Sequence, residues 1–354
     1  MALKTTTIGA YPKPPGVRVP QWHHDKPESD AGVHPTDPTR AYSAFLRQRT
    51  PEDERAIDLG TQDVVREQDA LGIDIPTDGE VRREHYIYYH LRRLQGFDFE
   101  RLTEREMRDG GWSARVPTVT GPIKAGERFL RHDWRVAQEA TEKPVKITVP
   151  GPLTVWGSTA DDYYSDPQSF CAAMGDALNA EIRDLAEAGC PWIQVDEPLL
   201  ARHPDLALAF GIDNLARCFH KVPKETMRAV HICCGYPAEV DQEDYPKADP
   251  AAYGRMAEAL ELAAIDAVSL EDAHRHNDLR LLETFTGTTV MLGVLDIARS
   301  EVEQVEDIRD RLRAALEHID PHRLIAAPDC GLAMLDRRLV QAKLKAMVEA
   351  ARQV

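Results

Sequence analysis

A chain of 354 residues, 43% of them apolar, is long enough for one large α/β barrel or for two smaller domains. Its formal net charge of −16 at pH 7 argues against nucleic-acid and anionic-membrane partners, which require basic patches. The sequence has no apolar run of 18 residues and no signal-peptide layout at its N-terminus, so we expect a cytoplasmic protein without a membrane span.

Eight short apolar, β-prone runs recur along the chain, separated by stretches with helical periodicity. The predicted strands cover residues 5–8, 73–76, 145–149, 192–195, 229–232, 267–270, 289–293 and 324–327. Apolar residues spaced by three and four predict helices that include 169–188, 302–316 and 336–352. Strands alternating with helices predict an α/β fold, a (β/α)8 TIM barrel whose active site lies at the carboxyl ends of the strands.

Two stretches do not fit a minimal barrel. Residues 11–51 are rich in proline and histidine, and residues 84–142 combine a charged segment (100–108) with a small predicted hairpin (116–126). We interpret them as insertions after the first and second strands. The sequence therefore predicts a single catalytic domain, residues 1–354, that carries both insertions.

Glycine, carboxylate, imidazole or thiol groups follow nearly every predicted strand. They are Gly9, Asp78, Gly79, Glu80, Gly151, Asp196, Glu197, His231, Cys233, Glu271, Asp296, Asp329 and Cys330. A single carboxylate such as Asp196 has a simpler explanation as the cap of the following helix. The full set is harder to explain in that way, and a barrel brings these positions together.

Two thiols, one imidazole and one carboxylate in this set form a ligand group that suits Zn²⁺. They belong to His231, Cys233, Glu271 and Cys330. Zinc fingers place their ligands in close sequence pairs, whereas these ligands lie on separate strand ends. The pattern therefore indicates a zinc enzyme that handles a thiol.

With these residues in view, the chain resembles the cobalamin-independent methionine synthase family. It is similar to the catalytic C-terminal barrel alone, in a compact form without the family's N-terminal duplicate. The motifs are Thr-Thr-Thr-Ile-Gly at 5–9, Asp-Gly-Glu at 78–80, Pro-Gly-Pro-Leu-Thr at 150–154, Ile-Gln-Val-Asp-Glu-Pro at 193–198, His-Ile-Cys at 231–233, Ser-Leu-Glu at 269–271 and Pro-Asp-Cys-Gly-Leu at 328–332.

The resemblance implies an S-methyltransferase like 5-methyltetrahydropteroyltriglutamate–homocysteine methyltransferase. The methyl group would pass from 5-methyltetrahydrofolate or a methylcorrinoid to the thiol of homocysteine, forming methionine. Zinc deprotonates a bound thiol at neutral pH, which makes it a nucleophile. Glu271 would leave the metal as the substrate sulfur enters, since a carboxylate leaves more easily than a thiolate.

The resemblance also implies the roles of the site residues. Zinc would be bound by His231, Cys233, Glu271 and Cys330. The homocysteine amino group would be held by Glu80 and Asp196, and its carboxylate would lie near the backbone of Ile8 and Gly9. Trp156 is expected either to stack against a flat substrate ring or to pack in the core or at the rim.

Two positions depart from the family pattern. Ala10 replaces the usual serine, and Ala298 replaces a histidine thought to deliver a proton to the leaving folate nitrogen. Losing a general acid lowers a rate by about 10²–10⁴. Either another acid serves here or the methyl donor differs.

These departures leave room for other functions. One is zinc-dependent alkyl transfer to a different thiol, as in the epoxyalkane–coenzyme M transferases, which would need cationic groups for a sulfonate in place of Glu80 and Asp196. Another is a structural zinc in a binding protein, because four protein ligands are typical of closed sites. The methyl donor and the oligomeric state, including a homo-oligomer, stay open.

Overall fold

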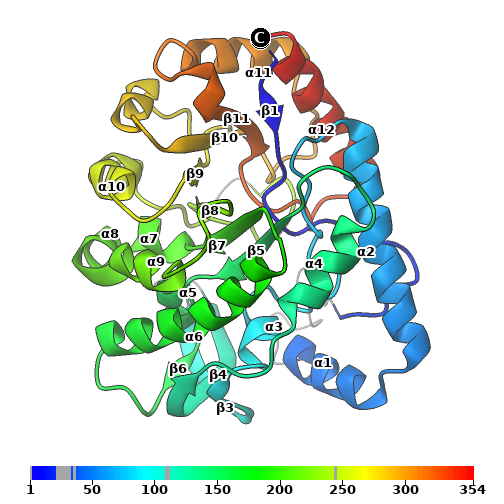
Figure 1. The fold of residues 1–354 in the computed structure, drawn as a ribbon, viewed down its shortest axis with the longest axis vertical. Helices are drawn as coiled ribbons and strands as arrows, with labels where there is room; N and C mark the ends of the chain where they lie inside the picture. The colour runs from blue at the N-terminus through cyan, green and yellow to red at the C-terminus, as the bar shows by residue number, and fades with distance from the viewer. Residues whose placement is uncertain (1, 21–32, 35–36, 108–111, 243–244) are drawn as a thin grey trace.

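The computed structural model describes residues 2–20, 33–34, 37–107, 112–242 and 245–354. Its centre is a curled sheet of seven parallel strands in the order β1-β11-β10-β9-β8-β7-β5, and helices surround it (Figure 1). The strands are β1 (Lys4–Thr5), β5 (Lys146–Pro150), β7 (Trp192–Asp196), β8 (Met227–Ile232), β9 (Ala267–Leu270), β10 (Thr289–Leu295) and β11 (Leu324–Pro328).

The described helices include those that the apolar periodicity predicts, α6, α11 and α12. The helices are α1 (Asp37–Gln48), α2 (Pro51–Leu71), α3 (Tyr88–Leu91), α4 (Leu130–Gln138), α5 (Pro152–Gly157), α6 (Pro167–Glu187), α7 (Pro198–Arg202), α8 (Pro204–Leu206), α9 (Asp213–Cys218), α10 (Ala252–Glu261), α11 (Val305–Ala315) and α12 (Arg337–Arg352), with shorter turns η1 (Ala207–Gly211), η2 (Leu279–Thr284) and η3 (Pro321–Arg323). None of these helices combines the length and the apolar character needed to cross a membrane.

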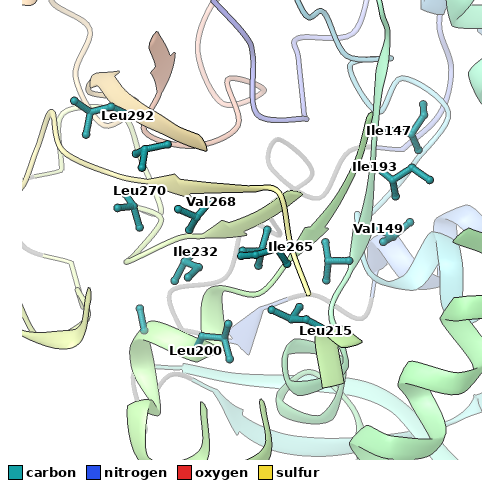
Figure 2. Packing of buried hydrophobic residues seen from close by; sticks show 14 of the residues in the cluster. Ile147, Val149, Ile193, Leu200, Leu215, Ile232, Ile265, Val268, Leu270 and Leu292 are labelled. Atoms are coloured by element: carbon teal, nitrogen blue, oxygen red, sulfur yellow. The ribbon is translucent and has the colours of Figure 1, made fainter. Parts of the chain in front are cut away.

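Alternate residues of each strand pack on opposite faces of the sheet, as strand geometry requires. One set packs with helix residues in the main core; Figure 2 labels Ile147, Val149, Ile193, Ile232, Val268, Leu270 and Leu292 from this set. The other set forms a smaller cluster inside the curve of the sheet, without any helix residue: Ile8, Ile75, Trp192, Ala229, Ala267, Met291, Ile325 and Ala327. By the same alternation Asp196, His231 and Ser269 lie on the inner face.

The predicted second strand, residues 73–76, forms no continuous ladder. Two single bridges occur there, from Thr6 to Ile75 and from Thr77 to Lys146. The Gln68 side chain binds both backbone groups of Thr77: its Oε1 accepts from the Thr77 N–H at 3.0 Å, and its Nε2 donates to the Thr77 carbonyl at 2.9 Å. A side chain thus replaces part of a strand ladder. The α/β class is confirmed, with the other seven predicted strands present.

The two irregular stretches contain more regular structure than the sequence suggests. In residues 11–51, helix α1 is formed, while residues 21–32 and 35–36 lie outside the described part. In residues 84–142, the small hairpin predicted at 116–126 is wrong. A longer antiparallel pair, β3 (Gln95–Met107) with β4 (Trp112–Lys124), takes its place and includes the charged segment. The register shifts between Asp98 and Leu102, which breaks the alternation that would have revealed β3. Two short strands, β2 (Val33–His34) and β6 (Ala160–Asp161), pair with β4.

Candidate metal centre and substrate cavity

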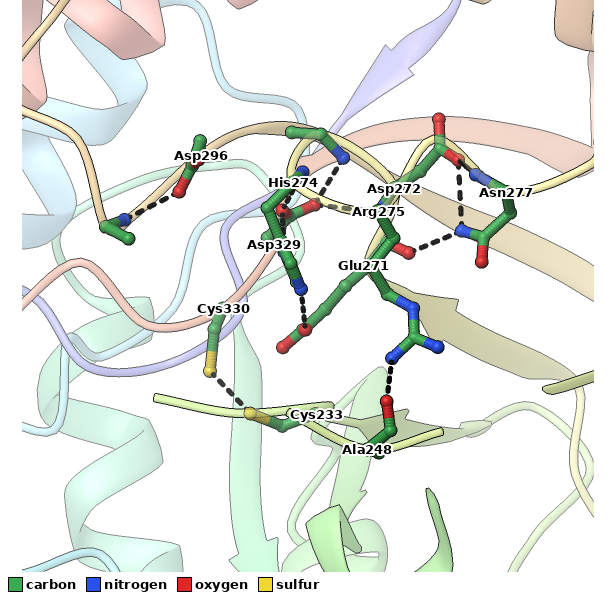
Figure 3. A network of polar contacts seen from close by, with 12 residues as sticks. Cys233, Ala248, Glu271, Asp272, His274, Arg275, Asn277, Asp296, Asp329 and Cys330 are labelled. Carbon is green, nitrogen blue, oxygen red and sulfur yellow. Dashed lines mark hydrogen bonds and ion pairs between the residues drawn. The ribbon is translucent and has the colours of Figure 1, made fainter. Parts of the chain in front are cut away.

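Four ligand-type side chains converge at the carboxyl ends of β8, β9 and β11. One ligand atom from each of His231, Cys233, Glu271 and Cys330 lies within 4.8 Å of the other three. The Cys330 Sγ is 3.6 Å from the Cys233 Sγ and 3.5 Å from the His231 Nε2. Figure 3 shows the two thiols facing each other below Glu271. The structure therefore brings together all four predicted metal ligands.

The chemistry of this group fits a divalent cation. Glu271 is fully buried, and neither of its carboxylate oxygens has a hydrogen-bond partner in the described chain. Burial raises the pKa of Glu271, because water no longer solvates its charge. The Cys330 thiol donates to Cys233, which lowers the pKa of the Cys233 thiol. Two sulfurs, one nitrogen and one oxygen at these separations match a four-coordinate Zn²⁺ site.

Neighbouring groups orient two of the ligands. The His231 Nδ1 lies 3.0 Å from the Ser269 Oγ, which leaves Nε2 directed at the centre. The Glu271 backbone N–H donates to the Tyr253 hydroxyl at 3.0 Å, and this hydroxyl donates to the Ile232 carbonyl at 2.7 Å. Ser269 belongs to the Ser-Leu-Glu motif and lies two residues before Glu271. Residues two apart on a strand point to the same face, so this spacing could have placed Ser269 beside the ligands. Nothing in the sequence pointed to Tyr253.

Asp329 organises the loop that follows β9. Its carboxylate accepts hydrogen bonds from the backbone N–H groups of Asp272, Ala273 and His274 at 2.8–3.0 Å. Its Oδ2 also lies 2.7 Å from the His274 Nδ1, and the His274 Nε2 lies 3.5 Å from the Glu271 Oε2 (Figure 3). The aspartate of the Pro-Asp-Cys motif thus holds the loop that carries one metal ligand, while the adjacent cysteine is another.

A cavity of about 390 Å³ opens beside the metal ligands. Its wall contains every residue predicted to bind substrate together with three of the predicted metal ligands: Ile8, Gly9, Glu80, Trp156, Asp196, His231, Cys233 and Cys330. Glu271 does not line the cavity, because it lies fully buried behind the other three ligands. The roles of these residues in substrate binding stay predictions.

Glu80 is held in a strained position at the cavity wall. Its backbone has φ +54°, in the left-handed region that residues other than glycine rarely adopt. Its Oε1 accepts from the Thr148 Oγ1 at 2.7 Å and lies 3.5 Å from the Arg83 guanidinium. A Cβ at Gly9 would lie 2.7 Å from the same oxygen, so a larger residue there would displace the Glu80 carboxylate. Arg83 was missed because a lone arginine carries no sequence signal.

Asp196 is the second carboxylate of the cavity. Its Oδ1 accepts from the Gln194 Nε2 at 2.7 Å, and burial raises its pKa to about 7. The capping interpretation is wrong: α7 has Glu197 at its N-cap and no side-chain capping bond. Glu197 also binds elsewhere, since its carboxylate accepts from the N–H groups of Leu153 and Thr154 at the start of α5.

Trp156, on α5, is partly exposed at the cavity wall and not in the core. The Arg105 guanidinium of β3 lies 5.4 Å from its ring centroid and donates to its carbonyl at 2.7 Å.

Of the two departures from the family pattern, Ala10 lines the cavity and Ala298 does not. Ala298 is buried, with its N–H donating to the Asp296 Oδ1.

Comparison with known proteins agrees with this geometry. The family described as "Cobalamin-independent synthase, Catalytic domain" matches residues 3–353 of the chain. The chain belongs to the cobalamin-independent methionine synthase family. This membership confirms the resemblance, and it confirms an S-methyltransferase as the class of enzyme.

The chain is similar over nearly its whole length to proteins named as methionine synthases or homocysteine methyltransferases. The methionine synthase of Thermococcus kodakarensis is 27% identical over 351 residues, covering 98% of this chain and 92% of the relative. The 5-methyltetrahydropteroyltriglutamate–homocysteine methyltransferase of a Synechococcus species is 29% identical, covering 99% of this chain and 43% of its own length. A B12-independent methionine synthase from Shewanella, solved with selenomethionine, superimposes with a TM-score of 0.84 at 28% identity, covering 99% of this chain and 97% of that structure.

Proposed function

We propose that this protein transfers a methyl group to the thiol of homocysteine and forms methionine at a zinc centre. The observation that carries the proposal is one cavity lined both by ligand-type side chains, His231, Cys233 and Cys330, and by two carboxylates, Glu80 and Asp196. The Thermococcus relative is a methionine synthase, and the Shewanella structure contains selenomethionine, an analogue of the product.

The chain's own residues would bind and orient the amino acid. Glu80 and Asp196 supply negative charge for the substrate ammonium group, and the backbone of Ile8 and Gly9 lies at the same wall for its carboxylate. Zn²⁺ bound by His231, Cys233, Glu271 and Cys330 would lower the pKa of the substrate thiol and so supply a thiolate nucleophile at neutral pH. Three of these ligand side chains are buried, and Cys330 is partly exposed at the cavity.

A sulfonate thiol of the coenzyme M type fits this wall less well. Its negative end would meet Glu80 and Asp196, and like charges disfavour binding. The only guanidinium in contact with Glu80 in the described chain belongs to Arg83, whose side chain is almost fully buried and also contacts Asp78. The two carboxylates therefore favour homocysteine over the alternative thiol.

For the methyl donor we propose a methylfolate. The name of the Synechococcus relative specifies such a donor for that protein. A cavity of about 390 Å³ with Trp156 at its wall suits homocysteine and a flat bicyclic ring, whereas a corrinoid macrocycle is larger than this space. Because the side chain of Ala298 carries no acidic proton, a proton for the leaving nitrogen would come from another group.

A second part of the proposal concerns the closure of the barrel and the domain organisation. We propose that residues 73–77 close the curled sheet between β1 and β5, completing a (β/α)8 barrel through the two bridges at Thr6–Ile75 and Thr77–Lys146. Residues 1–354 would then form a single catalytic domain, with 11–51 and 84–142 as insertions after the first and second strands. A cytoplasmic location and a homo-oligomer stay predictions.

The test is methionine formation by zinc-loaded protein from homocysteine, in parallel with 5-methyltetrahydrofolate and methylcobalamin. We expect product with the folate, loss of zinc and of activity in Cys330→Ala, and neither loss in Cys171→Ala, which removes a buried thiol of α6 that is not among the four ligand-type side chains. Product with methylcobalamin alone would refute a methylfolate as the donor. Absence of product with both donors, despite bound zinc, would refute the proposed reaction.

A further inference from the structure

The side chain of one lysine, Lys146, is completely buried. Lys146, the first residue of β5, is 0% exposed and points into the inner face of the sheet. Its Nζ donates to the Gln194 Oε1 at 2.6 Å and lies 3.8 Å from the Met291 Sδ. None of these partners in the described chain is a carboxylate. Burial lowers the pKa of Lys146 to about 7. Burying an amine in this way is unfavourable for stability, so a methionine or leucine would suit the position better on stability alone.

Gln194 connects this lysine to the substrate wall. Its Nε2 donates to the Asp196 Oδ1 at 2.7 Å and to the Ile8 carbonyl at 3.0 Å. The Ile8 carbonyl can only accept, so the Gln194 amide turns its Nε2 toward Ile8 and Asp196 and its Oε1 toward Lys146. Without Lys146, the amide oxygen would lose its donor, and the Gln194 side chain would lose one of the three contacts that hold it in place.

We propose that Lys146 is a positioning residue: through Gln194, which is also bound to the Ile8 carbonyl, it holds the Asp196 carboxylate in place for the amino group of the thiol substrate. The inference rests on the proposed function, which assigns Asp196 to the amino group of homocysteine. It deepens that function by naming what sets the specificity for an amino-acid thiol.

The neighbouring residue on the same face of β5 supports the other carboxylate. The Thr148 Oγ1 donates to the Glu80 Oε1 at 2.7 Å. One strand therefore supports both carboxylates that are predicted to bind the substrate amino group, Glu80 directly and Asp196 through Gln194. The role of Lys146 does not depend on its charge, because both the ammonium and the amine form carry an N–H that can donate to Gln194.

Calorimetric titration with two thiols tests the inference. Zinc-loaded wild type and Lys146→Met are titrated with homocysteine and with 4-mercaptobutanoate, which has the same thiol and carboxylate but no amino group. We expect homocysteine to bind about tenfold more weakly to the variant, the loss of one hydrogen bond to a charged group, and the analogue to change by less than about twofold. Met291→Leu, which alters the same layer without a hydrogen bond to Gln194, should leave both affinities unchanged.

The outcomes separate the two proposals. A wild type that binds both thiols equally would refute the assignment of the cavity to an amino-acid thiol. A wild type that prefers homocysteine, with the full preference retained in Lys146→Met, would refute the positioning role alone.

Gln194→Met removes the side chain that joins Lys146 to Asp196. It tests the same inference if Lys146→Met does not fold. We expect it to weaken homocysteine binding as much as Lys146→Met does. The double variant should lose nothing further, since both changes break one connection. Additive losses would overturn the inference.

Discussion

Buried polar side chains one contact away from the ligands decide the geometry of this site. Ser269 orients His231, Tyr253 holds the Glu271 backbone, and Gln194 holds Asp196. Groups that hold a ligand in this way commonly change metal affinity or activity by about 10–100-fold when they are removed. Each of them lies on a strand or helix of the core, which fixes its side chain by packing.

The buried lysine makes stability depend on pH with a definite sign. Its pKa is lowered from 10.5 to about 7 in the folded protein. Between these values the unfolded chain binds more protons than the folded chain, so the contribution of Lys146 to the free energy of unfolding rises with pH over this window. Lys146→Met has no such group. We therefore expect the variant to equal or exceed wild type in stability near pH 7, and to lose this advantage towards pH 10.

Urea unfolding of both proteins at several pH values measures the difference, in which the titrating groups that do not interact with Lys146 cancel; Asp196, whose charge acts on Lys146, is the exception. A difference that is constant from pH 7 to pH 10 would contradict the prediction.

Among the elements, α2 connects the insertion region to the cavity. Its Glu67 accepts from the Tyr11 hydroxyl at 2.7 Å, and its Gln68 binds Thr77 beside the substrate wall. The helix begins with a capping box, in which the Thr50 Oγ1 accepts from the Asp53 N–H and the Asp53 carboxylate accepts from the Thr50 N–H. It ends at Gly72, whose φ of +94° suits glycine.

Removing this cap should destabilise the helix and with it the fold. Thr50→Ala leaves an N–H of the first turn without its partner, and we expect the free energy of unfolding to fall by about 1 kcal/mol. Arg66→Ala, at an exposed position of the same helix, should change it by less than about 0.5 kcal/mol. Denaturant unfolding compares the two; equal effects would mean that the capping box contributes nothing of its own.

At the scale of the whole molecule, the two ends of the chain meet. The Leu3 N–H donates to the Ala351 carbonyl at 2.9 Å, and Figure 1 shows α12 beside β1. Helix α12 buries one face against the sheet and α2, including Leu344 and Met347, which are fully buried. The last helix therefore covers β1 and also contacts β11, the strand that leads to Cys330.

Truncating one buried residue of α12 tests how much the packing of this helix contributes to the free energy of unfolding. Leu344→Ala leaves a cavity and should lower the free energy of unfolding by about 3 kcal/mol, within the range for such substitutions. Lys345→Ala, on the exposed side of the same helix, should change it by less than about 0.5 kcal/mol. If the helix docked only loosely, both variants would unfold at the same denaturant concentration as the wild type.

Strands and ligands were predictable because their signals are local. A buried parallel strand reads as an apolar run, and the residue after it lies at the functional edge of the sheet, so His231 and Glu271 were found without a structure. The charged hairpin was not predicted correctly, and the strand predicted at residues 73–76 forms only single bridges with its neighbours. Strand β3 contains a register shift, and Thr77 obtains its hydrogen bonds from a side chain on another element.

The amino-acid order alone indicated the class of fold, the four candidate metal ligands and the family, because each depends on residue type and on short-range spacing. Only the tertiary structure decided that Glu80 and Asp196 share a cavity with the metal ligands, that Ala298 lies outside it, and that Lys146 reaches Asp196 through Gln194. These relations join residues up to 186 positions apart, as between Gln194 and Ile8. Such contacts are set by how the sheet curls, and no local pattern of side chains encodes them.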